Sequence, residues 1–189
     1  MKFKLGIVII LVTLSVKSQN IIPIDTTHWE IQAQSHMIEN FKGKKSIYLQ
    51  GGFISWKKGE FLNGTIEFDI FLKEEQAFPG VFFRVDDDLN SEEFFLRPHL
   101  SGKEDANQTA PLTHGGTAFQ LYFGSKYSFP YKYKYDDWTH VKVVVNDNKA
   151  QVYMDHSEEP NFSWNLFHKV KSGGVSIRGG NRSGMHISN

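Results

Sequence analysis

Apolar and polar residues alternate along much of the chain, in short runs that turn residues separate. The run 64–72 places apolar side chains on one face and acidic ones on the other, Ile66, Phe68, Ile70 and Leu72 against Glu67 and Asp69. A period of two residues is the pattern of a β-strand with one buried face. Asn63-Gly64 directly before this run is a strong turn signal, so the pattern predicts a strand that begins after a turn.

The same alternation predicts further strands over 80–87, 92–99, 117–124, 138–147, 149–156, 173–180 and 185–188. In 138–147, three valines at 141, 143 and 145 oppose Trp138, His140 and Lys142, and a turn follows at 146–148. The less regular segment 21–62 is expected to hold the first strands of the same domain. After the N-terminal segment no long stripe of period 3.6 occurs, and the pattern therefore predicts an all-β fold, an antiparallel two-sheet β-sandwich of jelly-roll type.

The first twenty residues differ from the rest in character. Lys2 and Lys4 precede an almost wholly apolar run from Leu5 to Leu14, and small residues follow near Ser18. This run is too short to span a bilayer comfortably, and the order of basic, apolar and small residues is typical of a cleaved secretory signal. We expect a signal peptide over 1–18, one domain over 19–189, no membrane span, and export to the periplasm or the extracellular space.

Charge and cysteine content narrow the function classes. The 189 residues carry 21 Lys and Arg against 21 Asp and Glu, a formal net charge of zero. A neutral chain offers no electrostatic reason to bind nucleic acid. The chain has no cysteine, so its fold depends on its core alone. Its 16 phenylalanines suit packed sheets or surfaces on which ligands stack.

The order of three segments carries a family resemblance. "GTIEFDI" leads to "GVFFRV", and the hairpin "DDWTHVKVVVNDNKAQVYMD" precedes "GGVSIRG". From about Gly51 to Ser188 the chain resembles the concanavalin A-like lectin/glucanase superfamily, in particular its laminin-G-like branch in secreted bacterial proteins. The resemblance implies the β-sandwich fold and a bacterial source, but it does not imply one activity, because this fold hosts lectins, glycosidases, lyases and adhesive modules.

The candidate binding residues gather around the segment "FFLRPHLSGKEDANQTAP". Sugars are bound by planar polar groups that reach pairs of hydroxyls and by aromatic faces against ring C–H groups. The predicted ligand-binding set is Arg84, Arg97, His99, Gln108, Gln120 and Tyr122, with Gln108 expected on a loop beyond the strand. The structural alternative is that each arginine pairs with a nearby carboxylate, among them Asp105, and fixes a loop.

Carboxylates raise the questions of a metal and of catalysis. The run "VDDDLNSEE" could hold calcium, but it lacks the spacing of an EF-hand loop, so we expect no metal ligands and no cofactor there. Laminarinase-type members of the superfamily carry Glu-x-Asp-x-x-Glu on one strand; Glu67 and Asp69 match its first two positions, and Leu72 stands at the third. Since a glycosidase needs two carboxyl groups at the scissile bond, the incomplete pattern disfavours an enzyme, although another acid pair or a lyase-like set of His99, Tyr127 and Arg97 stays open.

Three function hypotheses follow from these observations. The first is a non-catalytic module that recognises a carbohydrate or glycan. The second is a glycan-active hydrolase or lyase of the same fold, and the third is an adhesive module that binds another protein. The Arg97-Pro98-His99 segment either lines a binding site at a strand end or fixes the loop that follows.

Overall fold

A computed structural model describes residues 20–180 and 183–188, and the expected signal peptide over 1–18 lies outside these residues. Two short 3-10 helices, η1 (Pro98–Leu100) and η2 (Phe119–Leu121), lie among twelve strands. The strands are β1 (Trp29–Phe41), β2 (Lys44–Trp56), β3 (Gly64–Leu72), β4 (Gly80–Val85), β5 (Ser91–Leu96), β6 (Asn107–Leu112), β7 (Ser128–Phe129), β8 (Asp137–Asn146), β9 (Lys149–Met154), β10 (Phe162–Asn165), β11 (Gly174–Arg178) and β12 (Met185–Ser188).

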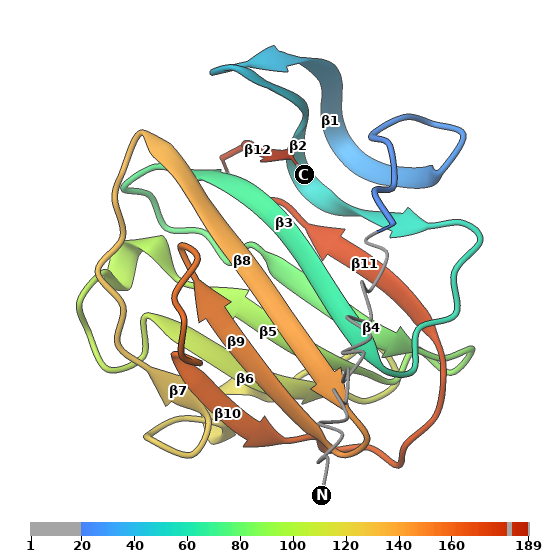
Figure 1. Ribbon diagram of the computed structural model, residues 1–189, viewed down its shortest axis with the longest axis vertical. Helices are drawn as coiled ribbons and strands as arrows, with labels where there is room; N and C mark the ends of the chain where they lie inside the picture. The colour runs from blue at the N-terminus through green and yellow to red at the C-terminus, as the bar shows by residue number, and fades with distance from the viewer. Residues whose placement is uncertain (1–19, 181–182, 189) are drawn as a thin grey trace, which may run out of the picture.

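Antiparallel pairing links the strands in the order β10-β9-β8-β3-β12-β2-β11-β4-β5-β6-β7, and β1 pairs with β2. In Figure 1, β8, β9 and β3 lie in front of β4, β5 and β6. We call β10-β9-β8-β3-β12 the front sheet and β11-β4-β5-β6-β7 the rear sheet. The all-β, antiparallel two-sheet sandwich that the sequence predicts is confirmed.

Strand β2 joins the two sheets. Its residues 46–49 pair with β12 of the front sheet, and its residues 53–55 pair with β11 of the rear sheet. Between them, Gly51 has φ 59°, and a Cβ on Gly52 would lie 1.9 Å from the Gln32 carbonyl oxygen. Only glycine tolerates this combination of positive φ and close backbone approach, so the glycine pair allows the change of partner.

The core lies between the sheets and follows the alternation of the sequence. Val141, Val143 and Val145 of β8 are buried against the inner residues of β3, as the period of two predicts. Val81 and Phe83 of β4 fill the core from the rear sheet. β-branched residues suit these positions because they pack well on a pleated surface. The β8–β9 turn at 147–148 also matches its prediction, with Asp147 at φ 49°.

Two sequence-based expectations near β6 are wrong. The segment 117–124 is not a strand but a loop that contains η2, and the supposed polar loop around Gln108 is strand β6, which pairs in register with β5. The polar side chains of β6 find partners that the sequence does not show: Tyr133 donates its hydroxyl proton to Asn107 Oδ1 at 2.6 Å, and Thr109 bonds the Glu93 carbonyl oxygen at 2.8 Å. Such hydrogen bonds lower the cost of burying Tyr133, Thr109 and the Asn107 side-chain carbonyl oxygen.

Candidate functional site

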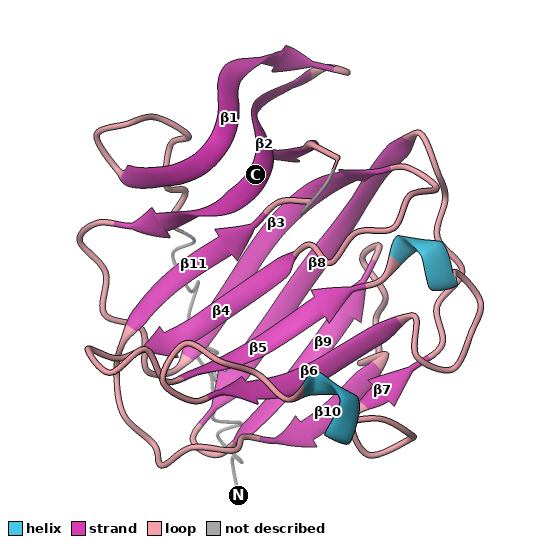
Figure 2. Cartoon of the chain, turned by 180° about the vertical axis from the view of Figure 1, so that it is seen from behind, coloured by secondary structure: helices cyan, strands magenta, loops and turns pink. Residues whose placement is uncertain are grey.

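The rear sheet, whose strands β4, β5 and β6 lie toward the viewer in Figure 2, brings charged and aromatic side chains together on its outer face. The strand register aligns one residue from each of β11, β4, β5 and β6, namely Ser176, Phe82, Glu93 and Ala110. These four side chains point away from the core, because their sequence neighbours fill it and successive side chains alternate across a strand. The sheet therefore carries a carboxylate beside an aromatic ring in the middle of its outer face.

Arg178 lies across this face in the next row. That row aligns Arg178, Gly80, Phe95 and Gln108. The Arg178 guanidinium lies 5.0 Å from the centre of the Phe82 ring and 5.9 Å from that of Phe95, and its Nε donates to the Phe78 carbonyl oxygen at 2.6 Å. Glycine is needed at position 80, since a Cβ there would lie 2.3 Å from a carbonyl oxygen of β5.

Glu93 forms an ion pair with Arg178. Arg178 Nη2 and Glu93 Oε1 are 2.5 Å apart, and the glutamate side chain is 1% exposed while that of the arginine is 21% exposed. Burial raises the pKa of Glu93 above its ordinary value, and the charge and hydrogen bond of Arg178 offset part of that rise. The result is a carboxylate held under a guanidinium whose outer side reaches solvent.

Arg97 and His99 extend the same face past the end of β5. The Arg97 guanidinium lies 5.8 Å from the Phe78 ring centre, and its Nη1 donates to Asp105 at 2.8 Å and to Gln108 at 3.2 Å. The His99 ring lies edge-on to Phe78 at 5.3 Å. Burial and the Arg97 charge lower the pKa of His99, so its imidazole is neutral at neutral pH and can both donate and accept.

Two buried nitrogens in this region have no hydrogen-bond partner among residues 20–180 and 183–188. They are Arg97 Nε and His99 Nδ1, both beside the Phe78 ring. Buried polar atoms in proteins are normally paired, and an unpaired one asks for an explanation. Arg97 and His99 therefore keep hydrogen-bonding capacity that the described residues do not use.

Gln108 holds the loop 113–127 against this face. Its side chain is 1% exposed, and its Nε2 donates to the carbonyl oxygens of Phe119 and Tyr122. The Phe119 ring packs on Phe78 and Phe95, at 6.3 and 6.4 Å between ring centres. Gln108 therefore fixes the loop 113–127, while Arg97 bonds Gln108 and, through Asp105, the loop that directly follows the Arg97-Pro98-His99 segment.

Gln120 and Tyr122, the two predicted ligand residues on this loop, have different surroundings. Gln120 lies exposed on η2. The Tyr122 ring packs edge-on against Tyr127 at 5.3 Å and Phe167 at 5.1 Å, toward the edge of the sandwich. The structure thus brings Arg97, His99 and Gln108 together, with Gln120 and Tyr122 on the loop that Gln108 anchors.

Arg84 does not join this group. Strands β4 and β5 are antiparallel, so Arg84 after Phe83 lies at the opposite end of the pair from Arg97. Its φ of 56° turns it out of the strand pattern, and its guanidinium donates to the carbonyl oxygens of Leu62 at 2.7 Å and Asp147 at 2.6 Å. Arg84 fixes two turns, which is the structural alternative, although its partners are carbonyl groups rather than carboxylates.

Sequence reasoning missed the two central residues, Arg178 and Glu93. The signal for Arg178 was its place in the predicted strand 173–180, where alternation puts it opposite Ile177. Nothing in the sequence pairs it with β4, because strand neighbours distant in the chain are not visible from periodicity. We call the rear-face cluster the set Phe78, Phe82, Glu93, Phe95, Arg97, His99, Phe119 and Arg178.

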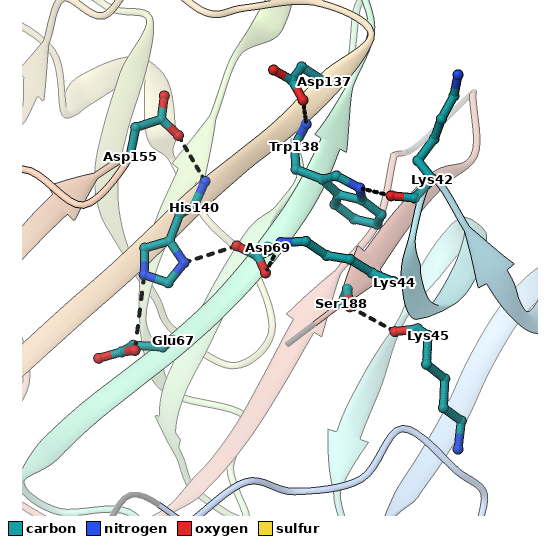
Figure 3. Close-up of polar contacts among 10 residues, drawn as sticks. All are labelled: Lys42, Lys44, Lys45, Glu67, Asp69, Asp137, Trp138, His140, Asp155 and Ser188. Atoms are coloured by element: carbon teal, nitrogen blue, oxygen red, sulfur yellow. Dashed lines mark hydrogen bonds and ion pairs between the residues drawn. The ribbon is translucent and has the colours of Figure 1, made fainter.

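Glu67 and Asp69, the two carboxylates of the incomplete catalytic pattern, lie on β3 of the front sheet, where both are near His140 (Figure 3). Asp69 Oδ2 is 2.7 Å from Lys44 Nζ, although β12 lies between their strands, and Asp69 Oδ1 is 2.9 Å from His140 Nδ1. His140 Nε2 lies 4.0 Å from Glu67 Oε2. Leu72, at the third position of the pattern, is 0% exposed and points into the core. This arrangement links β2, β3 and β8, and Asp155 Oδ1 accepts the backbone N–H of His140 at 2.9 Å.

The Asp69→Asn variant is expected to lose about 1–2 kcal/mol of unfolding free energy at pH 7, because two charge-assisted hydrogen bonds become weaker neutral ones. Burial would raise the pKa of Asp69, but the hydrogen bonds from His140 and Lys44 outweigh it and hold the pKa below its ordinary value. A depressed folded-state pKa gives stability that is present above about pH 4 and is lost as the pH falls through the folded-state value.

Urea unfolding of the wild type and the Asp69→Asn variant at pH 7 and at pH 3 measures this effect. We expect the difference between them to shrink at the lower pH. The Asp88→Asn variant, at an exposed position, is the control and should match the wild type at both values. An equal difference between Asp69→Asn and the wild type at both pH values would contradict the stabilising role of the Asp69 charge.

No protein-family model matches the chain, and no curated protein matches its sequence. Solved structures with a similar fold include the carbohydrate-binding module CBM66 from Bacillus subtilis, with a TM-score of 0.60 and 14% identity over 86% of this chain and 92% of that one. A putative glycosyl hydrolase from Parabacteroides distasonis has a TM-score of 0.56 and 13% identity, with 87% of each chain covered. The galectin LEC-6 from Caenorhabditis elegans has a TM-score of 0.51 and 12% identity, over 88% and 96% of the two chains.

These similarities define the class of the protein by its fold. The chain is a β-sandwich whose fold is similar to the folds of these three solved structures. At sequence identities of 12–14% the similarity concerns the fold alone. The function of this chain must therefore be argued from its own residues. No helix within residues 20–180 and 183–188 has the length and apolar character needed to cross a membrane.

Proposed function

We propose that this domain is a secreted, non-catalytic glycan-recognition module of the laminin-G-like type, and that it binds its ligand on the rear-face cluster. The observation that carries the proposal is the Arg178–Glu93 ion pair over the aromatic rings of Phe82 and Phe95. A buried ion pair contributes little to stability compared with apolar residues of the same volume. A pair of this kind on an outward face is better explained by ligand binding than by stability.

The chemistry of the cluster suits a sugar. Guanidinium groups present several N–H donors in one plane, which matches adjacent hydroxyl groups. The rings of Phe78 and Phe119 are half-buried and offer apolar surface to the C–H groups of a sugar ring. Neutral His99 adds a group that can donate or accept. The fold similarity to a carbohydrate-binding module and a galectin supports the same proposal.

Pairing of the carboxylates supports a non-catalytic role. Hydrolysis of a glycosidic bond requires a carboxylic acid that gives up a proton and a second free carboxylate. In the rear-face region Glu93 is paired with Arg178 and Asp105 with Arg97, so neither is a free carboxylate. The observation that favours a hydrolase instead is the raised pKa of Glu93, which burial causes and which suits a general acid.

The Arg178→Met/Glu93→Gln double variant is expected to bind glycan at least about tenfold more weakly than the wild type, since it loses a charge-assisted contact but keeps side-chain volume. Titration calorimetry with a glycan selected by an array screen measures the loss. Lys142→Met, on the outer face of the front sheet, is the matched control and should bind normally. The Phe119→Ala variant changes only the loop side of the cluster and provides a second test. Wild-type affinity in both cluster variants would overturn the proposed location.

A further inference from the structure

A pocket of about 600 Å³ lies at the edge of the sandwich opposite β2, apart from the rear-face cluster. Its walls come from the start of β9, from β10 and the residues after it, and from the loop that leads to β7. The edges of the two sheets meet here, and the Phe129 ring of β7 stacks on Phe162 of β10 at 5.2 Å. A volume of this size accommodates one or two sugar rings and falls in the usual range of ligand sites.

The side chains that line the pocket combine amines, small polar groups and aromatic rings. They include Lys126, Tyr127, Lys149, Ser163, Asn165 and Phe167. Tyr127 and Phe167 stack at 5.9 Å with 24° between their planes, and the Lys126 ammonium lies 5.1 Å from the Tyr127 ring centre. None of the described residues that line the pocket is an aspartate or a glutamate. The pocket is therefore positively charged and partly aromatic.

The two ammonium groups lack anionic partners within the protein. Neither Lys126 nor Lys149 takes part in an ion pair in the part of the chain that the structure describes, and both side chains are exposed. Two lysines at one pocket without a carboxylate repel each other slightly, and an anion between them relieves the repulsion. The charge of the pocket thus selects an anionic ligand.

The aromatic wall is held in place from behind. The segment after β10 is fixed by Glu92, whose Oε1 accepts the backbone N–H of Phe167 at 2.9 Å and of His168 at 2.8 Å. Tyr122 packs edge-on against both Tyr127 and Phe167. These contacts give the rings a fixed position before any ligand arrives, which lowers the entropic cost of binding.

We infer that this edge pocket is a second glycan site that takes an acidic sugar, with a uronate carboxylate between Lys126 and Lys149 and the sugar ring against the Tyr127–Phe167 wall. Ser163 and Asn165 supply hydroxyl and amide groups for the remaining sugar hydroxyls. The inference rests on the proposed function in one respect, that the ligand is a glycan. It adds a chemical class for the ligand, an acidic polysaccharide, and a site distinct from the rear-face cluster.

Titration calorimetry with trigalacturonate and with its methyl ester tests this inference on the full domain. We expect trigalacturonate to bind and its methyl ester to bind at least about tenfold more weakly. The affinity for trigalacturonate should fall as the salt concentration is raised. The Lys126→Met/Lys149→Met variant should lose about tenfold in affinity for trigalacturonate. The matched control, Lys132→Met/Lys134→Met, removes two exposed lysines outside the pocket and should leave binding unchanged.

The rear-face variant separates this inference from the proposed function. Binding of trigalacturonate that survives Arg178→Met/Glu93→Gln and falls in Lys126→Met/Lys149→Met supports the edge pocket. The opposite result overturns the edge pocket and leaves the rear-face proposal standing. Equal binding of trigalacturonate and its ester, or no binding of trigalacturonate, also overturns the inference, whatever glycan the rear-face cluster binds.

Discussion

The Arg178→Met variant is expected to lose about 3–5 kcal/mol of unfolding free energy, because it leaves the Glu93 carboxylate buried without a counter-charge. Methionine keeps the length of the stem and its contacts with the rings of Phe82 and Phe95. The loss therefore reports the charge rather than the packing. Urea unfolding at pH 7 measures it.

The pH dependence of this variant has a defined sign. Without Arg178, burial alone acts on Glu93 and raises its pKa further than in the wild type. A raised folded-state pKa favours the protonated form, so the variant should be least destabilised at low pH and lose stability as the pH rises through the folded-state value. Adding Glu93→Gln should restore most of the lost stability and remove the pH dependence, because a neutral amide then replaces the charge. A double variant as unstable as Arg178→Met would contradict this explanation.

The Gln108→Met variant is expected to lose about 2–3 kcal/mol, because it leaves the Phe119 and Tyr122 carbonyl oxygens without their donor. It also removes the bond from Arg97 to the Gln108 side chain. Since Gln108 anchors the loop 113–127, the variant should be cleaved faster in that loop by a protease at low concentration.

Limited proteolysis with mass spectrometry locates the cleavage. The Gln120→Met variant is the matched control, because Gln120 is exposed on η2 and its replacement should change neither stability nor cleavage. Cleavage of Gln108→Met outside 113–127, with that loop still protected, would show that Gln108 does not hold the loop.

The parts of the fold that the sequence predicts are those in which alternation is strong. Strands β3 and β8 place apolar residues inward and mostly polar ones outward, because only one face of each strand lies in the core between the sheets. Strand β6 was hidden by its polar residues, whose partners Tyr133, the backbone of β5 and the loop carbonyl oxygens of Phe119 and Tyr122 cannot be read from the sequence. The segment 117–124 alternates like a strand, but it forms a loop that lies on the outer face of the rear sheet, where Phe119 packs on Phe95.

The candidate site was predictable only in part for a similar reason. Arg97, His99 and Gln108 come from one short stretch, and residues close in sequence around a strand end are close in space. Glu93 and Arg178 come from β5 and β11, which have β4 between them. Their contact depends on sheet order and on the missing side chain at Gly80, and neither follows from a local pattern.

A glycan-array screen of the domain over residues 19–189, combined with a reducing-end assay on every glycan bound, tests the central claim most directly. The account predicts binding to at least one glycan with no release of reducing ends over a prolonged incubation. Release of reducing ends would contradict the non-catalytic role and point to the carboxyl group of Glu93 as the acid. Binding to no glycan at all would contradict glycan recognition and favour a protein-binding module, with the exposed Leu121 and Phe123 as the first surface to examine.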